Sequence, residues 1–196
     1  MERRAERTAE TRRRIERAAL KYFVEKGIEG ASIREISREA GVSQGAMYVH
    51  FTEKGNGKNQ LAWELFIAGW NEIGDGMRRA AQKHKKLRDK MRAMIEFVYR
   101  RYDEDSDLVT YVFRSRHEHL KRLPATRGNP YTVFRMVIAD AIRRGEIPPG
   151  DLELKTSLIV GAIVQPVDSK ILFRLEGPLS KSAPLTADCC TRLLGA

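Results

Sequence analysis

The chain has 196 residues, of which 42% are hydrophobic and 32% are charged, and its formal net charge is +10. This composition excludes a disordered chain, and the length is sufficient for one domain or two small ones with a buried core. Charged residues interrupt every apolar stretch before it reaches the roughly 20 residues that span a bilayer, so we expect no membrane helix. Residues 1–7 precede no apolar run, so we expect no secretory signal either. The excess of positive charge suits a polyanionic partner but does not identify one.

The sequence contains no signature of an enzyme or of a metal centre. It has no Gly-x-Ser-x-Gly, no Gly-rich phosphate loop, no His-Glu-x-x-His and no paired-cysteine motif. Its two cysteines, Cys189 and Cys190, are adjacent, which fits neither a disulfide framework nor the spacing of zinc ligands. We therefore expect no catalytic residue, no cofactor and no metal ligand, and a reducing cytoplasm is the simplest setting.

The first predicted element is an amphipathic helix over residues 8–26. Its apolar residues follow the i, i+3, i+4, i+7, i+8 pattern of one buried stripe, and Gly27 is expected to end it. The stripe consists of Ile15, Ala18, Ala19, Tyr22 and Phe23. Arginines at 12, 13, 14 and 17 lie near the start of this helix. They form either a solvated face or a set of phosphate contacts, with 12–14 the favoured donors.

Residues 32–51 have the pattern of a helix-turn-helix, a motif that lays its second helix in the major groove of DNA. Ser32 and Glu35 form a capping box at the start of the first helix. Gly41 supplies the positive φ that ends this helix, and Ser43 caps the next one. The second helix is short and mostly uncharged. Its small and amide side chains suit close approach to base edges and phosphates.

These residues together resemble the TetR family of bacterial one-component repressors. The resemblance covers about residues 8–54 and is carried by three consecutive segments: Thr11-x-x-x-Ile15-x-x-Ala18-Ala19-x-x-x-Phe23-x-x-x-Gly27, Ser32-Ile33-Arg34-Glu35-Ile36, and Ala40-Gly41-Val42-Ser43-x-Gly45-x-Met47-Tyr48-x-His50-Phe51. Three helices with these residues in register are more specific than a helix-turn-helix alone. The family's later helices diverge, so for residues 78–196 the resemblance implies little beyond an all-helical architecture.

The resemblance implies a DNA-binding role for particular positions. Ser43 and Tyr48 would hold phosphates, Gln44 and Ala46 would face base edges with Gly45 against the backbone, and His50 and Arg34 would also reach the DNA. The alternative reading is a packing role, which is expected for Ile36, Val42, Met47 and Phe51 and stays open for Tyr48. The family's phosphate-binding lysine corresponds to Lys54. However, the turn over residues 52–60 is about three residues longer than usual, so Lys58 stays a second candidate.

The rest of the chain reads as further helices joined by Gly- and Pro-containing turns. We expect a helix from Leu61 with apolar residues on several sides, whose Gly69, Gly74 and Gly76 serve either a hinge or close packing. Asp107 is expected to cap the helix that it begins. After the helix from Leu61, predicted helices cover 85–103, 107–120, 130–144, 152–175 and 186–195. No segment alternates with period 2, so the fold class is all-α: a three-helix head and a six-helix body, divided as 1–57 and 58–196.

The resemblance implies a homodimeric repressor that binds a double-stranded DNA operator and is released by a small apolar effector. Helices 152–175 and 186–195 would form the dimer contact. The effector would lie among apolar residues of the middle helices, each of which has plain core packing as its alternative role: Trp63, Phe66, Phe97, Tyr102, Phe113, Phe134 and Val137. Two other classes stay open, an effector-independent DNA-binding protein and a helical ligand-binding protein or enzyme.

Overall fold

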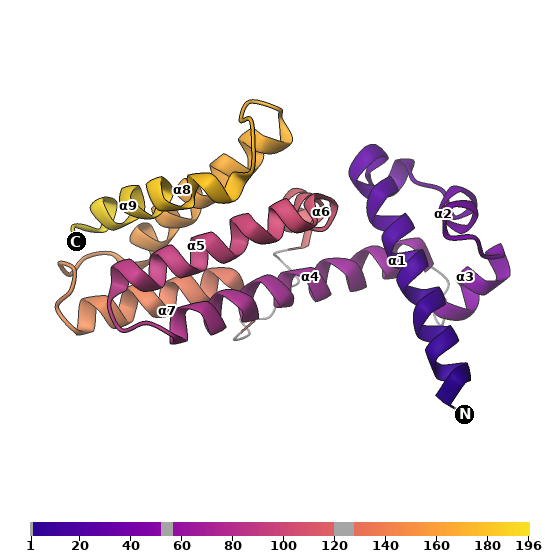
Figure 1. Ribbon diagram of the computed structural model, residues 1–196, viewed down its shortest axis with the longest axis horizontal. Coiled ribbons are helices and arrows are strands. Elements are labelled where there is room, and N and C mark those ends of the chain that lie inside the picture. The colour runs from indigo at the N-terminus through magenta and orange to yellow at the C-terminus, as the bar shows by residue number, and fades with distance from the viewer. Residues whose placement is uncertain (1, 52–56, 120–127) are drawn as a thin grey trace.

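The computed structural model describes residues 2–51, 57–119 and 128–196, without the side chains of residues 2–5 and 48–50. The described residues form α-helices and one short 3-10 helix, which confirms the predicted all-α class (Figure 1). The elements are α1 (Glu2–Gly30), α2 (Ile33–Ala40), α3 (Gln44–Phe51), α4 (Gly57–Gln82), α5 (Leu87–Glu104), α6 (Ser106–His119), α7 (Pro130–Arg143), α8 (Leu152–Ile171), η2 (Leu179–Ser182) and α9 (Ala183–Leu194).

The molecule has a small head of α1–α3 and an elongated body of α4–α9. Figure 1 shows the head at one end, with α4 running from it along the body and the C-terminus at the far end. The predicted boundary after residue 57 falls at the first residue of α4, because this helix begins at Gly57 rather than at Leu61. The division into two domains stays a prediction, since α4 contacts α1 and α3 as well as the body helices.

Helix α1 buries the stripe predicted from its spacing. Ile15 and Ala19 are fully buried, and Ala18, Tyr22 and Phe23 are nearly so. The helix begins earlier than predicted, but Gly27 interrupts it as expected, with φ 73° and ψ 169°. A side chain at that positive φ would be strained, so glycine is favoured there.

Helix α4 is buried along most of its length because other helices cover several of its sides. Leu61, Phe66 and Ile73 are almost inaccessible, and α4 packs against α1 and α3 in the head and α5, α6 and α7 in the body. The wide apolar surface of this helix therefore has the predicted role, because it lets α4 connect the head to the body.

The glycines of α4 are close-packing positions. A Cβ atom at Gly76 would lie 1.9 Å from Cζ of Phe97, and one at Gly69 would lie 2.7 Å from Cγ2 of Val112. Real Cβ atoms do not approach so closely, and no room exists for a methyl group unless the neighbours move. The packing alternative therefore accounts for these glycines without a hinge.

We expect Gly76→Ala to destabilise the protein by about 1–3 kcal/mol, because the methyl group overpacks the α4–α5 contact. The free energy of unfolding from urea denaturation measures this effect. Gly45→Ala is the matched control: its Cβ would meet only Oγ of Ser43, at 3.8 Å, so the gain in helix propensity should leave stability equal or higher. Equal stability of the wild type and Gly76→Ala would contradict the packing argument.

Three predicted helix ends are wrong by a few residues. Helix α6 is capped by Asp105, whose Oδ1 accepts the N–H of Leu108 at 3.1 Å, and Asp107 lies inside the first turn. Helix α8 ends at Ile171 rather than near 175, because Phe173 takes the left-handed conformation with φ 56°. Helix α9 begins at Ala183 rather than at 186.

Hydrogen bonds from buried tyrosines join the body helices. The hydroxyl of Tyr99 on α5 donates to the carbonyl of Ile163 on α8 at 3.1 Å, and burial raises the pKa of Tyr99 to about 12. Asn129 and Asp151 cap α7 and α8 through their side chains, as the sequence predicted. None of the described helices is long and apolar enough to cross a bilayer.

Candidate functional site

The capping chemistry predicted for the helix-turn-helix is present in full. Oγ of Ser32 accepts the N–H of Glu35 at 3.2 Å, and a carboxylate oxygen of Glu35 accepts the N–H of Ser32 at 3.2 Å. Gly41 ends α2 in the left-handed conformation, with φ 64° and ψ 39°. Oγ of Ser43 then accepts the N–H of Ala46 at 3.1 Å at the start of α3. Local sequence signals therefore set both the end of α2 and the start of α3.

The capping carboxylate is held in its charged form. Nζ of Lys26 lies 2.6 Å from Glu35, and this bond, followed by that of the Ser32 hydroxyl, lowers the pKa of Glu35 from 4.5 to about 2. Because the folded-state pKa is the lower one, the stabilisation is complete above about pH 4.5 and is lost as the pH falls towards 2.

We therefore expect acid to reduce the difference in thermal stability between the wild type and Glu35→Gln. The wild type should melt at the higher temperature at pH 6, and the two melting curves should converge near pH 2.5. The control is Glu25→Gln, because Glu25 is exposed and accepts no hydrogen bond from the residues that the structure describes. A difference that is the same at both pH values would contradict the low pKa.

The first turn of α3 presents a free surface to solvent. Ser43, Gln44 and Gly45 are exposed and Ala46 is half-buried, while Met47 and Phe51 face the core at 3% and 4% exposure. Gln44 thus has no packing role, and the predicted core role of Met47, Phe51 and Ile36 is confirmed. The predicted DNA contacts of Tyr48 and His50 involve side chains outside the described ones, and Lys54 lies outside the described residues.

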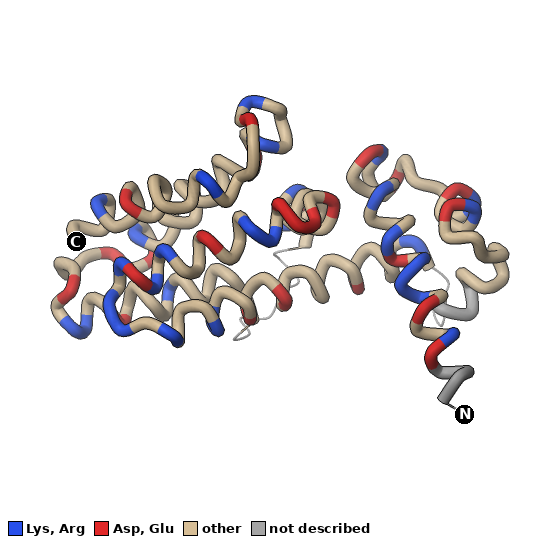
Figure 2. Tube along the Cα trace, in the orientation of Figure 1, with Lys and Arg blue, Asp and Glu red and all other residues tan. Residues whose placement is uncertain are grey.

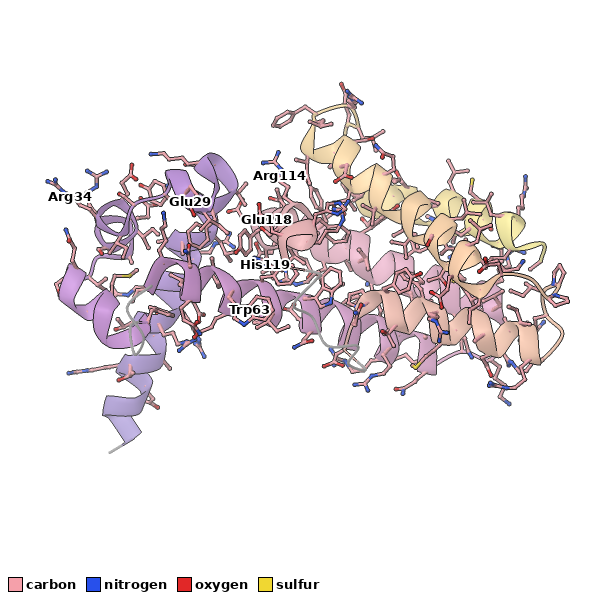
Figure 3. The ribbon with its side chains drawn as sticks, turned by 180° about the vertical axis from the view of Figure 1, so that it is seen from behind. Glu29, Arg34, Trp63, Arg114, Glu118 and His119 are labelled. Atoms are coloured by element: carbon pink, nitrogen blue, oxygen red, sulfur yellow. The ribbon has the colours of Figure 1, made fainter. Side chains whose placement is uncertain are left out.

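Two arginines of α2 add positive charge to the head. Arg34 and Arg38 are four residues apart, exposed, and without an ion-pair partner among the residues that the structure describes. Figure 3 shows Arg34 at the outer end of the head, away from the body. The sequence analysis named Arg34 and not Arg38, although the i, i+4 spacing places both on the same side of the helix.

Other predicted cations are engaged inside the protein. Arg12 bonds Glu16 and Glu64 at 2.8 Å each and lies over the ring of Phe51, so it joins α1, α3 and α4. Nζ of Lys58 contacts the carbonyl oxygen of Glu29 at 3.2 Å, at the end of α1. Arg13 and Arg14 stay exposed.

Helix α6 holds the head to the body. Its Arg114 donates to the carbonyl of Val24 on α1 at 3.3 Å, and the hydroxyl of Tyr111 donates to the carbonyl of Ala62 on α4 at 2.7 Å. At the other end of the helix, Arg17 of α1 bonds the capping residue Asp105 at 2.8 Å. Burial raises the pKa of Tyr111, so its hydroxyl remains a donor.

A cavity of about 510 Å³ lies among helices α4 to α8, and we call it the body cavity. Its lining is mainly apolar. It consists of Trp70, Ile73, Met77, Val98, Phe113, Arg116, His117, Asn129, Pro130, Tyr131, Phe134, Ser157, Val160, Gly161, Ile163 and Val164. The volume is in the range of sites for drug-sized ligands.

The polar groups of this lining are few and distinct. Arg116 donates to the carbonyl of Phe113, and its nearest carboxylate is Asp168 at 3.8 Å, beyond hydrogen-bond distance. Trp70 is 7% exposed, and its indole N–H has no acceptor among the described residues. A buried donor without a partner costs about 1–3 kcal/mol. No aspartate or glutamate belongs to the described lining.

The predicted ligand residues are only partly brought together. Phe113 and Phe134 line the body cavity, whereas Phe66, Tyr102 and Val137 lie in or against the core outside it. Trp63 borders a groove between head and body, near Arg114 and His119 (Figure 3).

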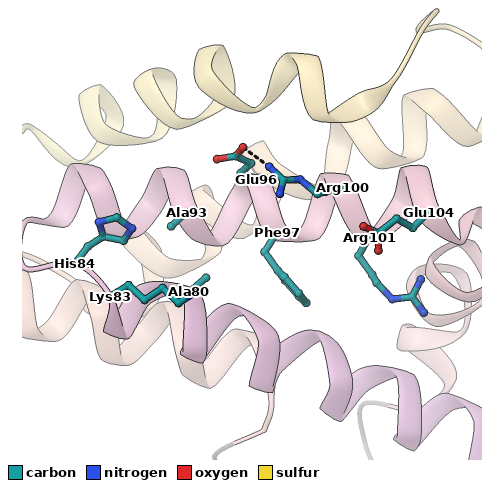
Figure 4. A pocket seen from close by; sticks show the side chains of 9 residues that line it. All are labelled: Ala80, Lys83, His84, Ala93, Glu96, Phe97, Arg100, Arg101 and Glu104. Atoms are coloured by element: carbon teal, nitrogen blue, oxygen red, sulfur yellow. Dashed lines mark hydrogen bonds and ion pairs between the residues drawn. The ribbon is translucent and has the colours of Figure 1, made fainter.

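Phe97 lies in another place, a pocket between α4 and α5. Figure 4 shows it with charged neighbours that include Arg100, Arg101 and Glu104. Its ring fills the space beside Gly76.

Sequence reasoning missed most of the body cavity, including Trp70, Arg116 and the α8 wall. The 3.6-residue repeat indicates which side of a helix is buried, but a cavity depends on which helices meet there. Among the described residues, no group of three or more His, Cys, Asp or Glu is placed to hold a metal ion.

Helices α8 and α9 leave apolar ridges uncovered. Leu154 and Leu158 on α8 are 58% and 51% exposed, and Leu185 and Leu193 on α9 are 70% and 55% exposed. Cys189 lies between the two leucines of α9 and is exposed, whereas Cys190 is buried. The i, i+4 spacing along each helix makes these residues continuous ridges.

Comparisons with known proteins support the helix-turn-helix class that the geometry of the head indicates. Residues 15–56 match the family model described as bacterial regulatory proteins, tetR family. The transcriptional regulator SrpR of Pseudomonas putida is 51% identical over 45 residues, 23% of this chain and 21% of that protein. AcrR of Shigella flexneri is 39% identical over 64 residues, 33% of this chain and 29% of that one. The matched region thus spans less than a third of these curated relatives.

Solved structures extend the likeness to the whole fold. A TetR family regulator from Marinobacter aquaeolei VT8 has a TM-score of 0.78 at 18% identity, covering 99% of this chain and 98% of that one. FadR of Bacillus subtilis, solved in complex with stearoyl-CoA, has a TM-score of 0.73 at 18% identity, with 91% and 96% covered.

A capped helix-turn-helix head on a body of six α-helices, counted over the described residues, is the architecture of a DNA-binding regulator. Residues 15–56 of the head carry the DNA-binding domain of the TetR family of bacterial regulatory proteins, and the body shares the fold of solved TetR family regulators. The matched relatives are regulators and not enzymes, in agreement with the class expected from the sequence.

Proposed function

We propose that the protein is a homodimeric repressor that reads a palindromic operator with α3 and is released when a small ligand occupies the body cavity. In this proposal Ser43 and Tyr48 bind phosphates, and Gln44, Ala46 and His50 face base edges. Gly45 allows the backbone to approach. Of the two candidate lysines, Lys54 is favoured, because Lys58 is engaged with Glu29.

The apolar ridges of α8 and α9 support the dimer. Two recognition helices must lie about 34–36 Å apart, or a multiple of this, to read the two halves of a palindrome, so dimerisation is a geometric requirement. Pairing the ridges of two copies as a four-helix bundle would bury four leucines per chain that a monomer leaves in water.

One observation carries the ligand-controlled part of the proposal: α6 borders both the cavity and the head. Phe113 and Arg116 line the cavity, while Tyr111 and Arg114 of the same helix bond α4 and α1. A ligand that shifts α6 shifts these bonds, and so changes the spacing of the heads between binding and non-binding states. FadR of Bacillus subtilis is a solved precedent for a ligand in this fold.

Retention of genomic DNA fragments by the purified protein tests the proposal. At roughly 0.2 M salt we expect a small set of fragments that share an inverted repeat, because base contacts survive when counterion effects weaken. The genes beside those fragments then indicate which compounds to test for release. Retention without any shared sequence would contradict operator recognition.

The second candidate, an effector-independent DNA-binding protein, is favoured only by the net charge of +10. Figure 2 shows lysine and arginine alternating with aspartate and glutamate along the trace, so the charge does not concentrate on the head. If raising the salt concentration abolishes binding to all DNA sequences equally, the effector-independent alternative is correct. Either form of DNA binding requires a cytoplasmic location.

A further inference from the structure

We infer that the ligand of the body cavity is an anionic amphiphile, with an apolar body among the helices and a carboxylate or similar oxyanion at Arg116. The inference rests on the proposed function, which makes this cavity the effector site. It goes further by assigning the charge and the orientation of the ligand.

The apolar body of the ligand follows from the apolar residues that line the body cavity. Ile73 and Met77 of α4, Val98 of α5 and Ile163 of α8 are buried in the chain and border the cavity. Displacing water from such surfaces favours a hydrocarbon or aromatic body over a polar one.

The negative charge of the ligand follows from the positive charge of Arg116 at one side of the cavity. Arg116 carries the only permanent charge in the described lining, which contains no carboxylate. Its side chain is 20% exposed, one N–H is donated to the Phe113 carbonyl, and its ion pair with Asp168 is a loose one at 3.8 Å, too long for a hydrogen bond. A guanidinium in this position has donors available for a ligand oxyanion, and charge-assisted bonds of this kind are the strong ones.

A second acidic group beyond the lining, Glu153, does not reverse this preference. Glu153 accepts the hydroxyl of Tyr131 at 3.0 Å and forms an ion pair with Arg135. Arg135 therefore balances the negative charge of Glu153, so this carboxylate is not a counter-charge for a cationic ligand.

The test uses three probes with the same chain and different heads: decanoate, decanol and decyltrimethylammonium, each below its micelle concentration. Isothermal titration with the full-length protein should show decanoate binding at least 10-fold more tightly than decanol, with the cation weakest. Arg116→Gln should remove the preference for decanoate and leave decanol affinity unchanged. Asp168→Asn should strengthen decanoate binding, because it removes the carboxylate that lies 3.8 Å from Arg116.

Arg100→Gln is the matched control, since Arg100 pairs with Glu96 in the pocket between α4 and α5 and does not border the body cavity. Equal binding of the three probes, or a decanoate preference that persists in Arg116→Gln, would overturn the inference and leave the cavity as an effector site. If no probe binds while operator binding is intact, both the inference and the cavity's effector role fail, but the DNA-binding role stands. Circular dichroism of each variant separates these outcomes from misfolding.

Discussion

Leu158→Glu is expected to convert the protein into a monomer that no longer holds a palindromic operator. Leu158 is 51% exposed on α8, within the ridge proposed to pair with a second copy. A charge in that contact adds a desolvation cost to the loss of apolar burial. Without the partner the second half-site is lost, so operator affinity should fall by about 10²–10⁴-fold.

Analytical ultracentrifugation measures the change in association, and fluorescence anisotropy measures binding to the full operator and to a half-site. The half-site affinity should be unchanged, because the head is intact. Met136→Glu is the matched control, since Met136 is 44% exposed on α7 and lies outside the proposed contact. A dimer that survives Leu158→Glu would exclude this ridge as the interface.

Gln44→Ala is expected to relax sequence preference with little effect on stability. Gln44 is exposed in the first turn of α3, and a bidentate contact from an amide to an adenine contributes about 1–3 kcal/mol of discrimination. The affinity ratio between the operator and a variant with one substituted base pair should therefore shrink by about 10–100-fold at that position and stay constant elsewhere.

Competition binding against a panel of singly substituted operators measures this ratio. Gln82→Ala is the control, because Gln82 is an exposed amide at the end of α4, far along the body from the head (Figure 1). Arg38→Ala offers a contrast: as a phosphate ligand it should weaken all operators alike and reduce the salt dependence. An unchanged preference in Gln44→Ala would remove this residue from base recognition.

The head was predictable because its signals are local. Ser32, Glu35, Gly41 and Ser43 act on backbone groups within a few residues, so their chemistry is readable from spacing alone. The error at the start of α6 arises because two local capping signals compete there. Asp105 and Asp107 are both able to cap α6, and Asp105, which also bonds the distant Arg17, is the residue that does so.

The body cavity was not predictable to the same extent. Phe97 and Phe113 are both predicted to meet a ligand, yet one packs on Gly76 and the other borders the cavity. Which of them meets a ligand depends on the packing of α4 against α5 to α8, and no periodicity in one helix encodes that. Charge pairing is equally long-range: the sequence leaves Arg12 open between a solvated face and a phosphate contact, and its partner Glu64 is 52 residues away.

In the proposed dimer, the two adjacent thiols of α9 would report assembly through their different reactivity. Burial raises the pKa of Cys190 to about 12, so this thiol is inert in the native fold, whereas Cys189 lies on the exposed ridge. A maleimide dye should therefore react slowly with the assembled dimer, at one site in the Leu158→Glu monomer, and at two sites once the chain unfolds. The number of dye molecules per chain, measured by mass spectrometry, distinguishes the three states without an introduced labelling site. Two rapidly reacting sites in the native protein would contradict the burial of Cys190.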